Sequence, residues 1–182
     1  MNEQSRVDLQ PTLRGDTISL RPLMPDDFEA LYAAASDPRI WEQHPEPLRY
    51  RRDVFEPGFF AAAIVSASAL IAIENESGTV IGCSRYYEWN PDQREVAIGY
   101  TFLIRSHWGG ATNRELKRLM LDHAFKWADV VWFHVGKSNM RSRRAMEKIG
   151  GTLSHEGYKE VNGVAQDYAY YKIEAPRAQR YR

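Results

Sequence analysis

The sequence predicts a mixed α/β domain in which helices pack on a sheet. Segments with strand-like alternation or short apolar runs are interleaved with segments of helical period, and turn residues separate them. In chain order they read as a strand, two helices, three strands, a helix, a strand, a helix and two strands. This interleaving favours one mixed sheet covered by helices. A chain of 182 residues is long enough for one domain with its own core.

The first third of the chain is expected to hold a strand and two helices. Thr17–Leu23 alternates polar and apolar residues and predicts a strand. Pro25-Asp26-Asp27 then opens a helix, because Pro is tolerated in a first turn and the helix dipole favours acidic side chains there. A Pro-rich loop follows through His44–Pro47. Asp53–Ala67 is predicted to be helical, with Pro57-Gly58 breaking or delaying its start.

The middle of the chain predicts three strands. Leu70–Glu74 and Thr79–Trp89 are joined by the turn-rich tetrad Asn75–Gly78. Asn90-Pro91-Asp92 is a second turn signal, and Glu95–Ile104 is a third, long strand.

The last part predicts two helices and three strands. We expect a helix from about Thr112 to Ala128, a strand over Val130–Val135, and a helix from Ser138 to about Ile149 that Gly150-Gly151 ends. Two further strands flank the pair Asn162-Gly163, which is typical of a hairpin turn. Their ranges are Gly151–Val161 and Asp167–Ile173. We divide the chain into an N-terminal arm (1–14), one domain (15–174) and a C-terminal tail (175–182).

Composition narrows the class of protein. The 24 Lys and Arg residues balance 24 Asp and Glu residues, which argues against a nucleic-acid binder that works through bulk positive charge. The single cysteine, Cys83, forbids an internal disulfide and a multi-cysteine metal site, and indicates a reducing compartment. The longest apolar-rich stretch, Phe59–Ile73, is shorter than the roughly 20 residues that span a bilayer. We therefore expect a cytoplasmic protein without a membrane or metal partner.

A Gly-rich turn before a helix is the first candidate binding element. Gly109-Gly110 separates the long strand from an amphipathic helix, whose first amide N–H groups lack intrahelical partners. Such a turn is either a plain connection or a cradle for a phosphate or pyrophosphate. Arg114, Lys117 and Arg118 lie in the first turns, where the dipole disfavours cations, so they indicate a bound anion or are simply solvated. The usual nucleotide-binding glycine motifs are absent from this junction.

The second candidate element is the start of the next helix. Asn139 and Ser142 are three residues apart and share a helix face. Asn139 is either an N-cap or a residue that holds an extended, amide-bearing ligand, while Ser142 offers a hydroxyl to the end of that ligand.

Together these segments resemble the GNAT N-acetyltransferase superfamily, most closely its branch of ribosomal-protein N-terminal-alanine acetyltransferases. The similarity covers about residues 15 to 174. The residues that carry it are Leu20–Leu23, Asp26-Asp27, Gly99-Tyr100, Trp108–Ala111, Asn139, Ser142, Ala145–Lys148, Gly150-Gly151 and Glu156-Gly157.

The resemblance implies a mostly antiparallel sheet with two splayed parallel strands and about four helices. Acetyl-CoA would lie in the opening, with its pyrophosphate on the amides of the turn and its pantetheine arm paired to the preceding strand. Asn139 would contact the arm, and Ser142 would lie near the sulfur as a proton donor. The implied cofactor-binding residues are Phe102, Leu103, Ile104, Trp108, Gly109, Gly110, Ala111, Thr112, Asn113, Asn139 and Ser142.

One departure from the family concerns the general base. The branch often has a Glu two residues before the Gly-Tyr pair, and this sequence has Ala97 there. Glu95 lies one alternation earlier on the same strand face, so it is our candidate to receive the ammonium proton through water. The alternative is an exposed carboxylate at a strand start. His134 also has two interpretations: it lines the cleft, or it is a hydrogen-bonded structural histidine.

The acceptor site is predicted from aromatic residues and carboxylates. Trp41 and Glu42 lie in the loop that covers the acceptor site in the family, and Tyr86 and Glu88 end a strand expected to border the same cleft. Aromatic walls with a carboxylate suit a cationic amine. Aromatic residues in strands also commonly belong to the core.

These observations predict an acetyl-CoA-dependent N-acetyltransferase that acetylates a primary amine, either a protein N-terminus or a small amine, by direct transfer in a ternary complex. The expected partners are acetyl-CoA and the amine, without nucleic acid or membrane. The sequence does not decide whether the protein forms a homodimer. One rival is an acyl-CoA-binding regulatory module without turnover, which Ala97 favours. A second rival is a protein-interaction domain without cofactor.

Overall fold

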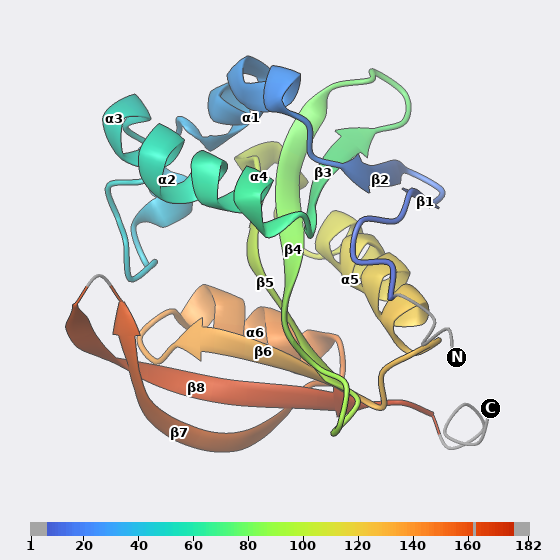
Figure 1. The fold of residues 1–182 in the computed structure, drawn as a ribbon. Coiled ribbons are helices and arrows are strands. Elements are labelled where there is room, and N and C mark those ends of the chain that lie inside the picture. The colour runs from blue at the N-terminus through green and yellow to red at the C-terminus, as the bar shows by residue number, and fades with distance from the viewer. Residues whose placement is uncertain (1–6, 162, 177–182) are drawn as a thin grey trace.

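One sheet of eight strands runs through the molecule, in the order β1-β2-β3-β4-β5-β6-β8-β7 (Figure 1). The computed structural model describes residues 7–161 and 163–176. Neighbouring strands are antiparallel except β5 and β6, which are parallel, so the predicted mixed sheet is confirmed. The strands are β1 (Leu13–Arg14), β2 (Ile18–Pro22), β3 (Ala69–Glu74), β4 (Val80–Asn90), β5 (Glu95–Leu103), β6 (Val130–Gly136), β7 (Thr152–Val161) and β8 (Val164–Glu174).

The helices lie between these strands in the chain, as expected. They are α1 (Phe28–Ala35) after a short turn η1 (Pro25–Asp27), α2 (Pro38–Trp41), α3 (Arg52–Phe55), α4 (Ala61–Ser66), α5 (Ala111–Ala124) after η3 (Arg105–His107), and α6 (Met140–Lys148). The predicted helix over residues 53–67 is divided into α3, a wide π turn η2 (Glu56–Phe60), and α4. The division falls at Pro57, which has no amide N–H to donate within a helix.

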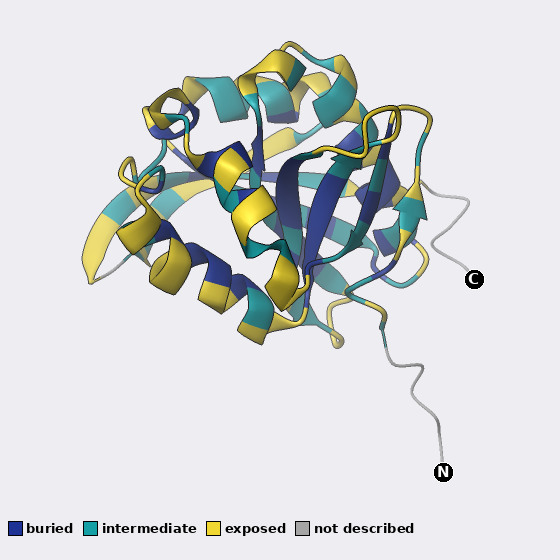
Figure 2. Cartoon of the chain, turned by 90° about the horizontal axis from the view of Figure 1, so that it is seen from above, coloured by how far each residue is buried: buried dark blue, intermediate teal, exposed yellow. Residues whose placement is uncertain are grey.

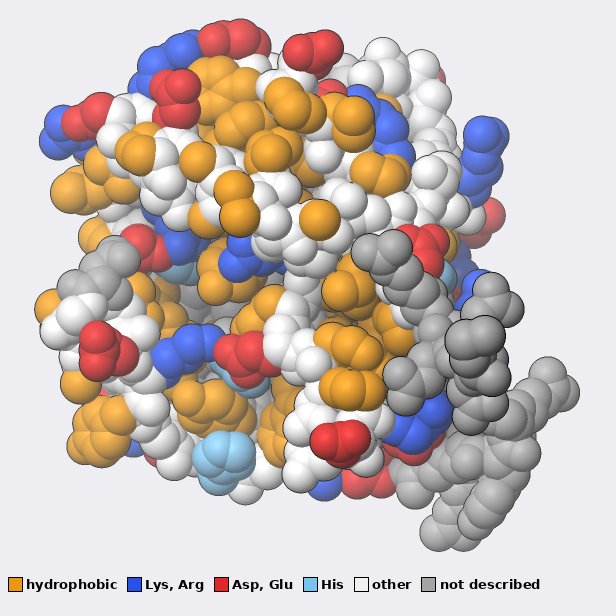
Figure 3. Space-filling view, in the orientation of Figure 1, with side chains coloured by type: hydrophobic (Ala, Val, Ile, Leu, Met, Phe, Trp, Pro, Cys, Tyr) orange, Lys and Arg blue, Asp and Glu red, His pale blue; other side chains and the backbone are white. Residues whose placement is uncertain are grey.

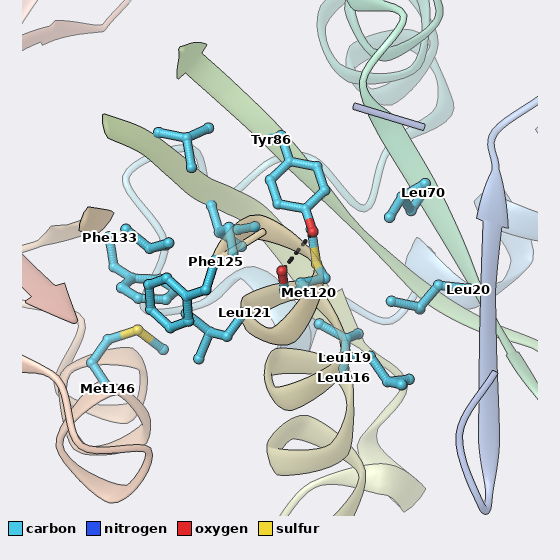
Figure 4. Packing of buried hydrophobic residues seen from close by; sticks show 14 of the residues in the cluster. Leu20, Leu70, Tyr86, Leu116, Leu119, Met120, Leu121, Phe125, Phe133 and Met146 are labelled. Carbon is cyan, nitrogen blue, oxygen red and sulfur yellow. Dashed lines mark hydrogen bonds between the residues drawn. The ribbon is translucent and has the colours of Figure 1, made fainter. Parts of the chain in front are cut away.

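Helices cover both faces of the central strands and create two cores (Figure 2). Alternation along β3 shows the two faces: Leu70 and Ala72 pack with α5, while Ala69 and Ile71 pack with α1–α4. Each large apolar side chain buried in this way contributes about 1.5–3 kcal/mol. Figure 4 shows the α5 side of the core, where the Tyr86 hydroxyl donates to the Met120 carbonyl oxygen at 2.7 Å.

Tyr86 therefore does not border an acceptor cleft, contrary to expectation. Its side chain is fully buried against α5. The reason is the strand period: Tyr86 and Tyr87 point to opposite faces of β4, and the face of Tyr86 is the one that α5 covers.

The parallel strands β5 and β6 separate soon after they pair. Glu95–Ala97 pairs with Val130–Trp132, and no pairing continues between the described residues beyond these. Where β5 leaves β6 it also bulges: Cys83 pairs with Phe102 and Arg85 with Gly99, so two residues of β5 oppose one of β4. Tyr100, in this bulge, has a φ of 52°. The bulge and the divergence place an opening at the centre of the sheet.

The ends of the chain differ in part from the predicted arm and tail. Within the predicted arm, Leu13–Arg14 pairs with β2, and Leu9 and Leu13 pack on the core. In the predicted tail, Ala175 is buried and its amide donates to the Asp129 carbonyl oxygen. Residues 1–6 of the predicted arm, residues 177–182 of the predicted tail, and Asn162 of the predicted hairpin turn lie outside the described residues. Within the described ranges, no helix combines the length and apolar character needed to span a membrane.

Candidate active site

A cleft of about 590 Å³ opens where β5 and β6 diverge and extends between the N-terminal ends of α5 and α6. Five cationic side chains line it, and no Asp or Glu among the described residues does. The five are Arg114, Lys117, Arg141, Arg144 and Lys148. A cleft lined by one sign of charge attracts ligands of the opposite sign, so this one suits a polyanion.

The predicted phosphate turn forms one rim of the cleft. Gly109 and Gly110 have φ angles of 100° and 136°, a region that favours glycine, and α5 starts directly after them. Trp108, Gly109, Gly110 and Asn113 line the cleft, whereas Ala111 and Thr112 do not. The indole Nε1 of Trp108 donates to the Leu103 carbonyl oxygen at 2.9 Å, which fixes the turn against the end of β5.

The end of β5 forms the floor of the cleft. Phe102 and Leu103 line it, and Ile104 does not. The Phe102 side chain is buried and packs against Trp41, with ring centroids 5.2 Å apart. Of the predicted cofactor-binding residues on this strand, Phe102 and Leu103 are therefore brought to the cleft.

Asn139 and Ser142 both line the opposite rim. The Oδ1 atom of Asn139 accepts a hydrogen bond from the Ser142 amide at 3.1 Å, so Asn139 is the N-cap of α6. The capping interpretation of Asn139 is thus confirmed. Capping and a place in the cleft coexist here, because the cap lies at the point where α6 meets the opening.

Arg141 connects the two rims. Its guanidinium lies 4.0 Å from the centroid of the Trp108 ring and donates to Glu42 at 2.9 Å. Glu42, predicted as an acceptor residue, is exposed and takes part in this ion pair. Trp41 is buried, lines the cleft, and donates from Nε1 to the Ala35 carbonyl oxygen at 2.7 Å.

A second cavity, of about 360 Å³, lies on the face of β5 and β6 opposite α5 and α6. Glu88 and Glu95 line it and, among the described residues, no Lys or Arg does, although the Lys159 ammonium forms an ion pair with Glu88 at 3.5 Å. The Glu95 Oε2 atom accepts from Trp132 Nε1 at 3.0 Å. The remaining lining residues are Asn90, Gln93, Ala97, His134, His155 and Tyr170. Figure 3 shows Lys and Arg, Asp and Glu, and His side chains meeting in the hollow between the helices and the β7–β8 hairpin.

His134 lines both the cleft and the cavity. Its Nδ1 atom accepts from the Lys159 ammonium at 3.2 Å, so its proton is on Nε2, which lies 3.9 Å from a Glu88 carboxylate oxygen. Burial, followed by the nearby Lys159 charge, lowers the pKa of His134 to about 4, so the ring is neutral at pH 7. Both sequence interpretations hold: His134 is hydrogen-bonded and it lines the opening. Because its accepting nitrogen Nδ1 already holds the Lys159 ammonium and its pKa is lowered, it is a poor base for an amine.

The sequence singled out Lys117 as an indication of a bound anion or as a solvated residue, and its burial in the cleft was not foreseen. Lys117 is 2% exposed and its Nζ atom donates to Thr101 Oγ1 at 2.6 Å. Burial lowers its pKa to about 7. The available signal was spacing, because Lys117 precedes Met120 and Ala124 by three and seven residues and so shares their buried helix face. Grouping it with Arg114 and Arg118, which are exposed, obscured that signal.

Cys83 lies beside the bulge but has little nucleophilic character. Its Sγ atom is 3.6 Å from the Tyr100 carbonyl oxygen, and burial raises the pKa of the thiol to about 12. Within the described part of the chain, no group of three or more His, Cys, Asp or Glu side chains is placed to hold a metal ion.

Comparison with known proteins places this architecture in a family. The family model described as "Acetyltransferase (GNAT) domain" matches residues 17–152. Among curated protein sequences, none matches the chain. The chain therefore belongs to the GNAT acetyltransferase family, and it is an N-acetyltransferase.

Solved structures share the fold at low sequence identity. A GCN5-related N-acetyltransferase from Brucella melitensis has a TM-score of 0.78 and 21% identity over 91% of this chain and 79% of that one. Spermidine N-acetyltransferase from Vibrio cholerae, in complex with CoA and spermine, has a TM-score of 0.67 and 20% identity over 88% of this chain and 97% of that one. Ribosomal-protein-S5-alanine acetyltransferase from Vibrio fischeri has a TM-score of 0.68 and 13% identity over 92% of this chain and 98% of that one. At these identities the likeness is one of fold.

Proposed function

We propose that the protein transfers the acetyl group of acetyl-CoA to a primary amine, either a small amine or a protein N-terminus, within a ternary complex. One observation carries the proposal: a cleft lined by cations meets a cavity lined by carboxylates at His134. Phosphates suit the first region and an ammonium group suits the second. The likeness in fold to a spermidine N-acetyltransferase with bound CoA and spermine supports this pairing of ligands.

The cleft supplies three kinds of contact for CoA. The start of α5 presents amide N–H groups and the positive end of its dipole to the pyrophosphate. Arg114, Arg144 and Lys148 line the same cleft and are candidates for further phosphate contacts. The edge of β5 that β6 leaves beyond Ala97 offers backbone groups to the amide-bearing pantetheine arm, as to an added strand.

The cavity is proposed to receive the amine. Glu95 supplies negative charge, and so does Glu88, although the Lys159 ammonium already lies 3.5 Å from the Glu88 Oε1 atom. Trp132 and Tyr170 supply aromatic surface for an ammonium group. Trp41 lies on the cleft side, where it shapes the opening, and Glu42 acts indirectly by holding Arg141.

Transfer requires a neutral amine beside the thioester carbonyl carbon. Glu95 accepts the ammonium proton through water, and the amine then forms the new C–N bond. The C–S bond breaks as the intermediate collapses, and we propose that the hydroxyl of Ser142, which lines the cleft, contacts the sulfur. Direct transfer is favoured because the single cysteine, Cys83, is buried with a raised pKa. We place the reaction in the cytoplasm, since this free cysteine suits a reducing compartment.

A thiol-release screen tests the proposal. Purified protein is incubated with acetyl-CoA and a panel that contains a polyamine, an aliphatic monoamine and peptides with different free N-termini. Amine-dependent release of CoA thiol, with an acetylated product of the expected mass, is the predicted result. CoA binding without thiol release for every amine would instead indicate a binding module.

A further inference from the structure

Lys117 combines burial, a place in the cleft and a direct link to the bulge of β5. It is the cation that α5 turns inward, whereas Arg114 and Arg118 on the same helix are exposed. Among the described residues, Thr101 Oγ1 is the one hydrogen-bond acceptor of its Nζ atom, although an ammonium group has three donors. The Nζ atom also lies 5.4 Å from the centroid of the Phe133 ring.

The contacts of Lys117 converge on the point where the sheet opens. Thr101 follows the bulge residue Tyr100, and its hydroxyl is 2.7 Å from Ser84 Oγ on β4. Phe133 lies on β6, across the divergence. Lys117 thus lies under the junction of β4, β5 and β6, and it lines the cleft beside Ile98 and Gly99.

A lysine buried here is costly for folding. An ammonium group that leaves water without a carboxylate partner lowers stability, and a similar-sized apolar side chain would not carry that cost. Stability alone therefore does not explain this residue. A donor of positive charge is useful where negative charge develops during a reaction.

We propose that Lys117 is a catalytic acid that protonates the sulfur of CoA as the tetrahedral intermediate collapses. This inference rests on the proposed function. As the C–S bond breaks, its electron pair stays on sulfur, and one proton moves from the Lys117 ammonium to the sulfur, which leaves CoA thiol and a neutral Lys117 amine. The acceptor ammonium loses two protons in the whole reaction. One replaces the proton of Lys117, and the other passes to solvent.

The charged and titratable groups around Lys117 allow this role. Cys83 on β4 is neutral because burial raises its pKa, and His134 on β6 is neutral at pH 7. The other cations in the cleft belong to α5 and α6 and are Arg114, Arg141, Arg144 and Lys148. No carboxylate of the described chain lines the cleft, so none competes for the Lys117 proton.

The test compares Lys117→Met with the wild type by single-turnover acetyl transfer, using an amine that the thiol-release screen has shown to be accepted. The titration of the amine affects both proteins equally. The ratio of the two rates therefore isolates the contribution of Lys117 to the transfer rate. We expect the wild-type rate to exceed the Lys117→Met rate by about 10²-fold below pH 7, since general acids typically accelerate a reaction by about 10²–10⁴-fold. The ratio should fall toward one as the pH rises well above 7, because neutral Lys117 has no proton to give.

Thr101→Val is the matched control, since it removes the hydrogen bond and keeps the amine. It should give a smaller rate ratio that does not fall with pH. Thermal melts separate catalysis from structure: Lys117→Met should melt at a higher temperature than the wild type at pH 7. That advantage should shrink from pH 7 to about pH 10, because a group whose pKa is lower in the folded state adds stability as pH rises between its folded and unfolded values.

Three results would overturn the proposal. They are an unchanged transfer rate in folded Lys117→Met, a rate ratio independent of pH, or a lower melting temperature with a rate loss that Thr101→Val reproduces. Lys117→Gln serves the same comparison if the Met variant does not fold. An inactive wild type would contradict the proposed function, whereas an active wild type with a pH-independent ratio would contradict the role of Lys117 alone.

Discussion

The cleft and the cavity meet at His134 but are built in opposite ways. The cleft depends on the backbone: two glycines with positive φ, the starts of two helices, a bulge and a pair of diverging strands. The cavity depends on side chains that alternate outward from strands β4 to β8. Their charges are also opposite, although the whole chain is neutral. A balanced composition therefore conceals a local separation of charge that matches a polyanionic donor and a cationic acceptor.

The largest expected effect tests the backbone origin of the cleft. Gly110→Asp places a carboxylate at the proposed pyrophosphate cradle and should weaken CoA binding about 10³-fold, which corresponds to about 4 kcal/mol of charge repulsion. Gly110→Asn is the matched control, because it carries the same backbone strain at φ 136° without the charge. Calorimetry should show much weaker binding for the Asp variant than for the Asn variant. Unchanged affinity in folded Gly110→Asp would mean that the cradle lies elsewhere.

The next effect tests the side-chain origin of the cavity. Glu95→Gln should lower turnover at saturating substrate by about 10²-fold near neutral pH, and activity should recover partly as the pH approaches the pKa of the amine. Glu88→Gln should act mainly on the Michaelis constant for the amine. If Glu95→Gln also changes only that constant, Glu95 binds the amine and another group accepts the proton.

A smaller effect distinguishes the two residues on the α6 rim. Asn139→Ala removes the N-cap and should cost about 1 kcal/mol of stability, together with weaker CoA binding. Asn139→Ser keeps a capping oxygen and should recover most of the melting temperature. Ser142→Ala should mainly lower turnover, so a normal specific activity in this variant would remove Ser142 from the reaction.

The smallest effect is the response to salt. Raising the salt concentration from about 0.05 M to about 0.5 M should weaken CoA binding several-fold, because several charges contribute in the open cleft. The Michaelis constant for the amine should change less, since a single ammonium group is involved. Equilibrium titration and steady-state kinetics at matched salt check this, and the reverse order of sensitivity would contradict the assignment of the two regions.

Much of the cleft could be predicted from the sequence because its determinants are local. Glycines before a helical period, Asn139 three residues before Ser142, and the strand that ends near Leu103 are each visible in short segments. These segments also carried the family resemblance, which the match over residues 17–152 confirmed. The mixed sheet and the positions of most elements followed from periodicity for the same reason.

The placement of individual side chains was less predictable because it depends on which strands and helices pack together. Tyr86 belongs to the core because α5 covers its face of β4, and sequence alternation alone does not say which face is covered. The pairing of Leu13–Arg14 with β2 also depends on a neighbour, since a two-residue strand has no detectable period.

By itself, the sequence determined the class of protein: an α/β fold, a glycine turn that opens a helix, a second helix with Asn139 at its start, and a single cysteine. The tertiary structure decided how the charges are distributed. It brought five cations from two helices to one cleft, placed Glu88 and Glu95 together on the other face, and turned Lys117 inward to Thr101. The physical reason is that local propensity acts between neighbours in the chain, whereas burial and electrostatic environment arise from segments that meet only in the folded sheet.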